Sequence, residues 1–191
     1  MIWRCLLVPA EATIAELHAV LQITFGWTGT HLHRFVIHST EYGIAYLGGI
    51  GFRDDAREIR LSGFGFRVGE RFVYDYDLTD GWRLDLRVEQ ILPAQPGRTY
   101  PRCVGGRRAS PPEGCGGPWV FLEQTAPHLV FAAVARAAEI VGQLLENDLA
   151  TLAEHRDEFA GLLPLLGLER FDHRGLNRAL ACPDITERSV V

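Results

Sequence analysis

The chain has 191 residues, and its 19 basic residues are all arginine because the sequence contains no lysine. With 24 acidic residues the formal net charge is −5. A chain without lysine has no Walker phosphate loop, no kinase-type strand lysine and no lysine for a Schiff base, which excludes those ATPases, kinases and imine-forming enzymes. The apolar share of 47% and the charged share of 23% are typical of a globular protein.

The sequence carries no pattern typical of export or membrane insertion. Its longest apolar runs, 129–135 and 162–168, are far shorter than the roughly 20 residues of a membrane span. Arg4 and Pro9 interrupt the N-terminus where a signal peptide has its apolar stretch. The four cysteines are too few and too scattered for a secreted disulfide scaffold. These features predict a cytoplasmic protein with no membrane partner.

The first 92 residues predict a strand, a helix and an antiparallel meander. Ile2–Val8 is an aliphatic and aromatic run that favours a strand. Thr13 and Glu16 form a capping box that begins a helix, and Gly26 ends it. Further strands are predicted, mostly from period-two alternation, over 31–38, 42–47, 71–78 and 82–92.

The remaining residues predict an ordered loop followed by helices. Prolines and glycines are frequent in 93–118, where no regular element is expected. Apolar spacing and capping residues predict helices over 125–144, 151–163 and 172–180, followed by a tail over 181–191. The predicted fold is therefore one α+β domain over 1–180, in which C-terminal helices (the part 125–180) pack beside a mostly antiparallel sheet.

Two histidines on one predicted strand form the first candidate site. His31 and His33 are two residues apart, so on a strand they share a face at about 6–7 Å and can reach one metal ion. Trp27 lies just before them. The alternative is that both imidazoles bond to neighbours in a half-buried sheet.

Acidic residues around a predicted hairpin turn form the second candidate site. Asp75 and Asp77 share a predicted strand face, so their charges repel unless a cation, an arginine or a shared proton lies between them. Asp80 lies in the turn and Trp82 follows it. This pattern fits a divalent-metal site or an acid/base pair. Alternatively, Asp80 caps the turn and neighbouring arginines neutralise the strand aspartates.

The proline- and glycine-rich loop contributes cysteines and arginines. Cys103 and Cys115 fit a zinc site only with outside ligands such as His31 and His33, because the loop has no Cys-x-x-Cys pair. The loop has no acidic residue before Glu113 but carries four arginines, which suit a phosphate or carboxylate ligand: Arg98, Arg102, Arg107 and Arg108. Alternatively, these arginines neutralise the acidic hairpin.

The motifs occur in the order IWR, FGW, HLH-x-F, YDYDL-x-D-x-W, YP-x-C, PPE-x-CGG and LNRAL. In this order the chain resembles the Ri-plasmid ORF-3-like family, whose members are often labelled transposon-passenger "TnpR-like" proteins. The resemblance spans residues 2–180 and rests most on Trp27, His31, His33, Asp77, Asp80, Trp82, Pro112, Glu113, Gly116 and Gly117.

The resemblance implies an α+β fold in a bacterial, cytosolic protein with no established activity. This chain departs from the family pattern at Leu84, where a histidine is usual, and at Gly114, where an aspartate is usual. A serine resolvase needs an activated serine among arginines and a DNA-binding helical module. None of the four serines lies in such a setting, so resolvase catalysis is not expected.

The leading functional hypothesis is a non-enzymatic binding or accessory module associated with plasmids or mobile elements, because no complete catalytic set is present. Trp27, Trp82 and Tyr100 would supply apolar contact, while Asp80 and Glu113 fix the loop and the turn. The expected partner is a protein or a small anionic ligand, and no resident cofactor is predicted.

Two alternatives stay open. The first is a metal-dependent hydrolase or nuclease-like enzyme, in which carboxylates and imidazoles hold a divalent ion that activates water: Asp75, Asp77, Asp80, His31 and His33. The second is a regulator that binds DNA through the C-terminal helices, and the negative net charge gives this little support.

Overall fold

A four-stranded antiparallel sheet forms the centre of the computed structural model, which describes residues 1–45, 50–146, 150–167 and 170–182. Its strand order is β3-β2-β4-β5. The strands are β2 (His33–Ile37), β3 (Thr40–Tyr42), β4 (Arg71–Tyr76) and β5 (Trp82–Arg87). Alternate side chains of β2 face the core, so Phe35 and Ile37 are fully buried.

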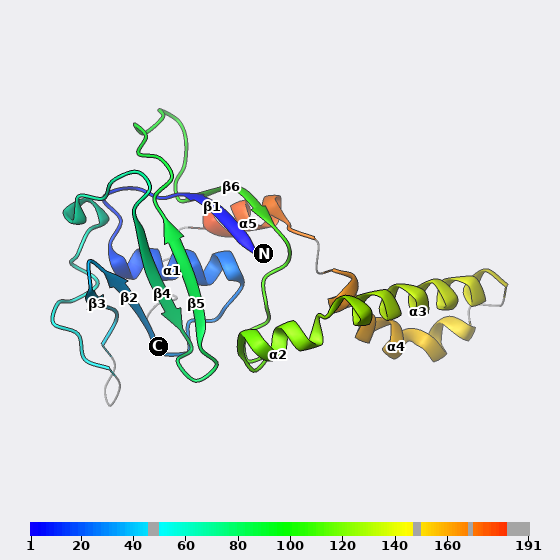
Figure 1. The fold of residues 1–191 in the computed structure, drawn as a ribbon. Coiled ribbons are helices and arrows are strands. Elements are labelled where there is room, and N and C mark those ends of the chain that lie inside the picture. Colours follow the sequence, from blue (N-terminus) through cyan, green and yellow to red (C-terminus); the bar gives the residue numbers. More distant parts are fainter. Residues whose placement is uncertain (46–49, 147–149, 168–169, 183–191) are drawn as a thin grey trace.

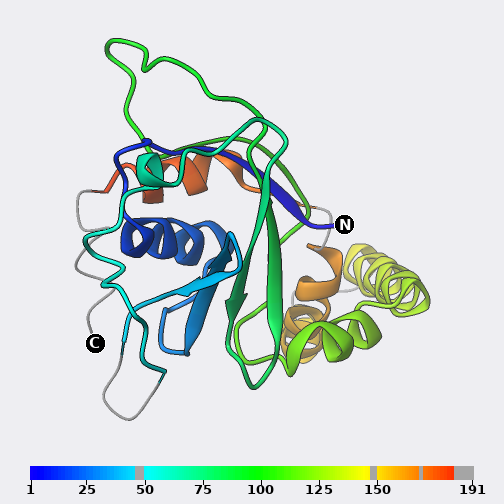
Figure 2. The same cartoon turned by 60° about the vertical axis from the view of Figure 1, so that its left-hand side comes forward.

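Helix α1 (Ile14–Phe25) lies against one face of this sheet, as Figures 1 and 2 show. The predicted capping box between Thr13 and Glu16 is present, and Gly26 ends the helix in the left-handed conformation. Ile14, Leu17 and Leu21 pack on the sheet. Val20 belongs to a second core cluster with Cys103 and Leu180. The helix is therefore buried on two sides.

A two-stranded antiparallel sheet pairs β1 (Trp3–Leu7) with β6 (Arg102–Arg107). Helix α5 (His173–Leu180) contacts β6 and α1, and its Asn177 side chain bonds both the N–H and the C=O of Cys103. Asp172 caps α5 as predicted. The expectation of no regular element over 93–118 is wrong for β6, because a strand rich in glycine still forms when a partner edge is available.

Three more helices complete the described chain: α2 (Gly117–Gln124), α3 (Pro127–Glu146) and α4 (Ala150–Leu166). α2 was not predicted, since it begins inside the proline- and glycine-rich segment. α3 and α4 contact one another and project from the sheets beyond α2 (Figures 1 and 2). We call α3 and α4 the arm. The predicted packing beside the sheet therefore holds for α5, whereas the arm stands away from it.

The structure also refines the predicted boundaries. The strand expected over 31–38 begins at His33, and the one expected over 42–47 is β3, displaced toward the N-terminus, while 46–49 lie outside the described residues. The helix expected over 151–163 is α4, which continues through Pro164. Most of the predicted tail, 183–191, also lies outside the described residues. None of the described helices has both the length and the apolar composition needed to cross a membrane.

Candidate functional site

The turn after β4 is organised by Asp77 rather than by Asp80. Asp77 has a φ of 48°, so the chain leaves the strand at this residue. Its Oδ1 atom accepts hydrogen bonds from the N–H groups of Thr79 and Asp80, each at 3.2 Å. The prediction that Asp80 caps the turn is therefore wrong, because the earlier aspartate already satisfies the turn amides.

His31 lies beside Asp77, with 3.4 Å between its Nδ1 and the aspartate Oδ2. The Asp77 side chain is 5% exposed and the His31 side chain 40% exposed. The imidazole also meets the ring of Tyr76 edge-on at 5.8 Å. An imidazole oriented by a buried carboxylate can exchange protons with a group at the surface.

Glu113 joins the loop before α2 to the sheet. Its Oε2 accepts from the N–H of Thr28 at 2.9 Å and from the Thr28 hydroxyl at 2.6 Å, and its Oε1 accepts from the Tyr76 hydroxyl. Partial burial raises the pKa of Glu113, but these hydrogen bonds outweigh it and hold the pKa below its ordinary value. Burial and the bond to Glu113 raise the pKa of Tyr76.

The two predicted contact tryptophans lie in the core. Trp27 stacks on Tyr76 at 4.9 Å and approaches Trp82 at 5.9 Å. Its indole N–H donates to the carbonyl of Pro111 at 3.1 Å. Trp27 is only 6% and Trp82 only 8% exposed. Their predicted role as partner-contacting surface is therefore wrong, and they fix the loop and the hairpin instead.

The paired glycines bring α2 against the hairpin. Asp80 Oδ2 accepts from the N–H of Gly116 at 3.1 Å. Gly117 has a φ of +86°, and a Cβ atom there would lie 2.2 Å from the carbonyl oxygen of Asp80. Only glycine allows this approach. We call the assembled group the hairpin joint; its members are Trp27, Thr28, His31, Tyr76, Asp77, Asp80, Trp82, Glu113, Gly116 and Gly117.

Of the joint residues, Tyr76 and Thr28 were not identified as site residues from the sequence. Tyr76 lies inside the YDYD run, and Thr28 directly follows Trp27. Their adjacency to the motifs was the available signal. The predicted Pro112 is exposed on the same loop, next to Glu113.

His33 points away from His31 into the core. It stacks on His18 of α1 with ring centroids 3.6 Å apart. His18 Nδ1 is 2.7 Å from the Tyr74 hydroxyl, which also accepts from Gln22 at 2.7 Å. Burial lowers the pKa of His18 to about 4. Burial, and then the charge of His18, lower the pKa of His33 to about 2. Both rings are therefore neutral core groups, which fits the alternative reading of His33.

Asp75 is neutralised by arginines, as the alternative reading of the acidic hairpin expected. Its carboxylate accepts from Arg34 Nε at 2.9 Å and from Arg83 Nε at 2.8 Å. Partial burial raises the pKa of Asp75, but Arg83 and Arg34 outweigh it and hold the pKa below its usual value. The five donors of the metal-hydrolase alternative are thus divided between the joint, the core and this ion-pair cluster.

The two loop cysteines are far apart in the fold, and the basic loop residues lie on or next to β6. Cys103 is buried on β6, whereas Cys115 packs against the main core near α2. Within the described chain no three His, Cys, Asp or Glu side chains are placed to share a metal ion. Arg102 and Arg107 stand at the two ends of β6, and Arg4 donates to the carbonyls of Arg107 and Arg108.

Two further residues predicted for the site, Arg98 and Tyr100, both contact Gln95 in the segment before β6. Arg98 donates to the Gln95 side chain at 2.6 Å, and the N–H of Gln95 donates to the Tyr100 hydroxyl at 3.2 Å. Tyr100 therefore orders its own loop and is not part of the hairpin joint.

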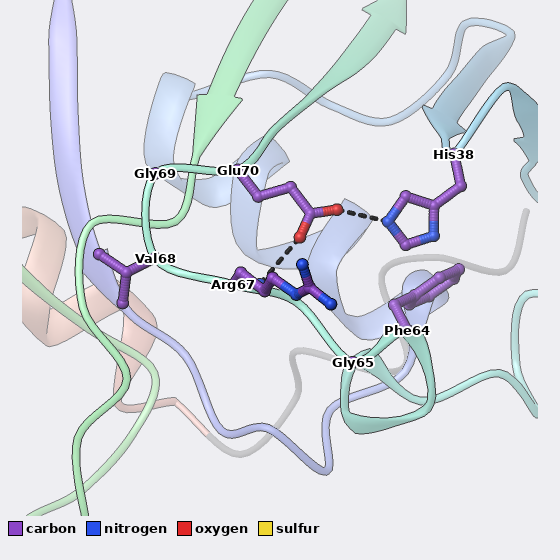
Figure 3. A pocket seen from close by; sticks show the side chains of 7 residues that line it. All are labelled: His38, Phe64, Gly65, Arg67, Val68, Gly69 and Glu70. Carbon is purple, nitrogen blue, oxygen red and sulfur yellow. Dashed lines mark hydrogen bonds and ion pairs between the residues drawn. The ribbon is translucent and has the colours of Figure 1, made fainter.

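An open hollow lies at the start of β4, the opposite end of this strand from the joint (Figure 3). Glu70 bonds the His38 ring and accepts from the N–H of Arg67 at 2.8 Å. Phe64 forms the wall beside His38. No sequence pattern predicts this hollow, because its residues come from a turn and a loop with no recognisable motif.

Comparison with known proteins places the chain among uncharacterised relatives. It is 33% identical over 124 residues to "Uncharacterized protein y4hQ" of Sinorhizobium fredii, which covers 64% of this chain and 63% of that protein. The chain thus matches less than two thirds of that relative's length.

The crystal structure of the "Protein of Unknown Function MM3350" from Methanosarcina mazei Go1 is similar, with a TM-score of 0.61 and 27% identity over 95% of this chain and 89% of that one. The family profile described as "Plasmid pRiA4b ORF-3-like protein" matches residues 1–127, from the N-terminus to the first residue of α3. The chain therefore belongs to the plasmid pRiA4b ORF-3-like family.

Proposed function

We propose that this chain is a protein-binding accessory module whose contact surface lies on α2 and the arm. Its partner presents an amphipathic helix with an uncharged apolar stripe, and the hairpin joint holds α2 and hence the arm in place. The observation that carries the proposal is the contrast between the joint, where polar groups bond to one another, and the arm, where large apolar side chains face solvent.

The bonding within the joint supports a structural role for its residues. The carboxylates of Asp77, Asp80 and Glu113 all accept hydrogen bonds from groups of the same chain. Asp77 accepts two of these bonds on one oxygen and Glu113 accepts three, and these bonds hold the turn and the loop in place. His31, which lies beside Asp77, is the exposed ring of the joint, with a side chain that is 40% exposed.

The exposed apolar side chains support the contact surface. Trp119 on α2 is 80% exposed and Phe131 on α3 is 77% exposed. Further exposed apolar residues on α2, α3 and α4 are Leu122, Val134, Val141, Leu145 and Leu163. A concentration of this kind is typical of protein interaction sites, whereas single exposed apolar residues are common on any surface.

Photo-crosslinking in the organism that encodes the protein tests this proposal. The full chain carries a photo-reactive amino acid at Trp119 or Phe131, and a matched control carries it at Leu92, an apolar residue between β5 and β6 that is 59% exposed. We expect one discrete protein adduct from the two helix positions and none from Leu92. Absence of an adduct at both helix positions, or equal labelling at Leu92, would overturn the proposal.

A further inference from the structure

We propose that the partner of the arm is a second copy of this chain, paired through α3. The inference rests on the proposed function and names the occupant of the same surface. It follows from the spacing, the charge and the extent of the exposed apolar residues of α3.

The exposed apolar residues of α3 follow the spacing of a coiled-coil seam. Phe131, Val134, Ala138, Val141 and Leu145 are separated by alternating steps of three and four residues. Apart from the small Ala138, which is also exposed, their exposed fractions are 77%, 51%, 45% and 84%. A sustained three–four spacing presents a continuous stripe that fits another helix.

α4 does not cover this seam, because it packs on a different face of α3. Ala133 and Ile140 are 3% and 1% exposed and lie on the face toward α4. Arg136 lies at the edge of that face, since it donates to Glu158 of α4 at 2.6 Å. On α3, then, one apolar face is filled within the chain and a second is left for a partner.

The charge pattern of α3 favours a copy of itself as that partner. The positions that flank the seam carry no charge and are Val130, Ala135, Ala137 and Gly142. Charges at such flanking positions normally select the partner, so their absence removes repulsion between two identical helices. Small residues at 135, 138 and 142 also let two helix backbones approach closely.

The exposed apolar area of the seam suits a modest two-fold contact. Its side chains present on the order of 400 Å² per copy, given about 200 Å² for a fully exposed aromatic side chain. This is about half of the roughly 800 Å² per partner of a standard interface, which fits association at micromolar concentration. A two-fold axis places the same surface on both copies, so one uncharged seam is sufficient.

Sedimentation and light scattering of the purified full chain test the pairing. We expect a species of twice the 21.3 kDa monomer mass at micromolar concentration. Val141→Glu places like charges in the seam and should raise the dissociation constant about 100-fold. The matched control is Gln143→Glu, which adds the same charge on an exposed position of α3 outside the seam and should leave the dimer intact. Unchanged circular dichroism in both variants shows that α3 is still helical.

Each outcome decides the inference. A monomer at all concentrations overturns it, and so does a dimer that persists in Val141→Glu, because that dimer uses another surface. If the chain is monomeric while Phe131 crosslinks to a different protein, the inference fails and the proposed function stands. If no crosslink forms and the chain is monomeric, both fail.

Discussion

Trp27 and Trp82 of the hairpin joint are 6% and 8% exposed, whereas Trp119, only two residues beyond the joint's Gly117, is 80% exposed. The joint uses its aromatic rings to fasten the loop 108–116 onto the sheet, and each of its carboxylates is bonded within the chain. The arm leaves its apolar residues in solvent. The most recognisable residues of the sequence therefore maintain the fold, while large apolar side chains that face solvent lie on the helices of the arm, which carry no motif.

Replacing one buried and one exposed tryptophan should give the largest difference in stability between the joint and α2. Trp27→Ala removes a buried ring that stacks on Tyr76 and should lower the free energy of unfolding by about 4 kcal/mol. The same change at Trp119 should cost less than about 0.5 kcal/mol. Urea unfolding at low protein concentration measures both values. Equal effects at the two positions would remove the distinction between the joint and the arm.

The stacked imidazoles of His18 and His33 should make the packing of α1 on the sheet sensitive to acid. The folded-state pKa values of His18, about 4, and His33, about 2, lie below the ordinary 6.5, so the unfolded state binds protons first as the pH falls. The contribution of the two neutral rings should be fully present well above pH 6.5 and should be lost by up to about 2.7 kcal/mol per pH unit between pH 6 and pH 5, and more gradually as the pH nears 4.

The pH dependence of urea midpoints checks this expectation, with circular dichroism as the signal. His18→Gln removes one of the two titrating rings and should reduce the slope by about half. A slope that does not change in this variant would assign the acid sensitivity to other groups.

Local signals were sufficient to predict α1 but not β6. Thr13, Glu16 and Gly26 specify the ends of α1 within one stretch of sequence. β6 forms because Arg102–Arg107 pairs with β1, which lies about 100 residues earlier in the sequence. In this pairing Trp3 lies opposite Arg107. Such a pairing leaves no periodic pattern in a strand that contains two glycines.

The sequence predicted many of the residues of the candidate site, but it predicted the roles of fewer of them. Period-two alternation predicted one strand face for His31 and His33, but β2 begins only at His33, and the ring that His33 meets, His18, comes from a helix that no pattern relates to this strand. Asp77 was expected on the face of Asp75, whereas its positive φ turns the chain there toward His31. Burial of Trp27 and Trp82 depends on the loop that covers them, which is a tertiary feature.

A glycine-to-alanine change should break the joint without removing any side chain. Gly117→Ala places a Cβ atom against the Asp80 carbonyl at a φ of +86°, and it should destabilise the protein by about 2 kcal/mol. Gly114→Ala is the control, since it too has a positive φ, +70°, but no neighbour within 4 Å. A smaller loss at Gly117 than at Gly114, measured by thermal unfolding, would contradict the close approach of α2 to the hairpin.

The Glu113 carboxylate should contribute less than the rings it anchors. Glu113→Gln keeps the size of the side chain but turns one acceptor oxygen into an amide donor that faces either Thr28 or Tyr76, at a cost of about 1.5 kcal/mol. The matched change Glu123→Gln, on exposed α2, should alter stability by less than about 0.5 kcal/mol. Equal urea midpoints for the two variants would show that the hydrogen bonds of Glu113 do not stabilise the fold.

The smallest expected effect has the opposite sign and lies in the arm. Gly161 is inside α4 and no atom lies within 4 Å of a Cβ placed there, so Gly161→Ala should stabilise the helix by about 1 kcal/mol. Because the arm contacts itself more than the sheets, this gain should slow amide hydrogen exchange about fivefold in α3 and α4 and leave exchange in β2, β4 and β5 unchanged. Slower exchange in both regions would mean that the arm and the sheets unfold as one unit. The joint would then couple the stability of the arm to that of the sheets, besides holding the arm in place.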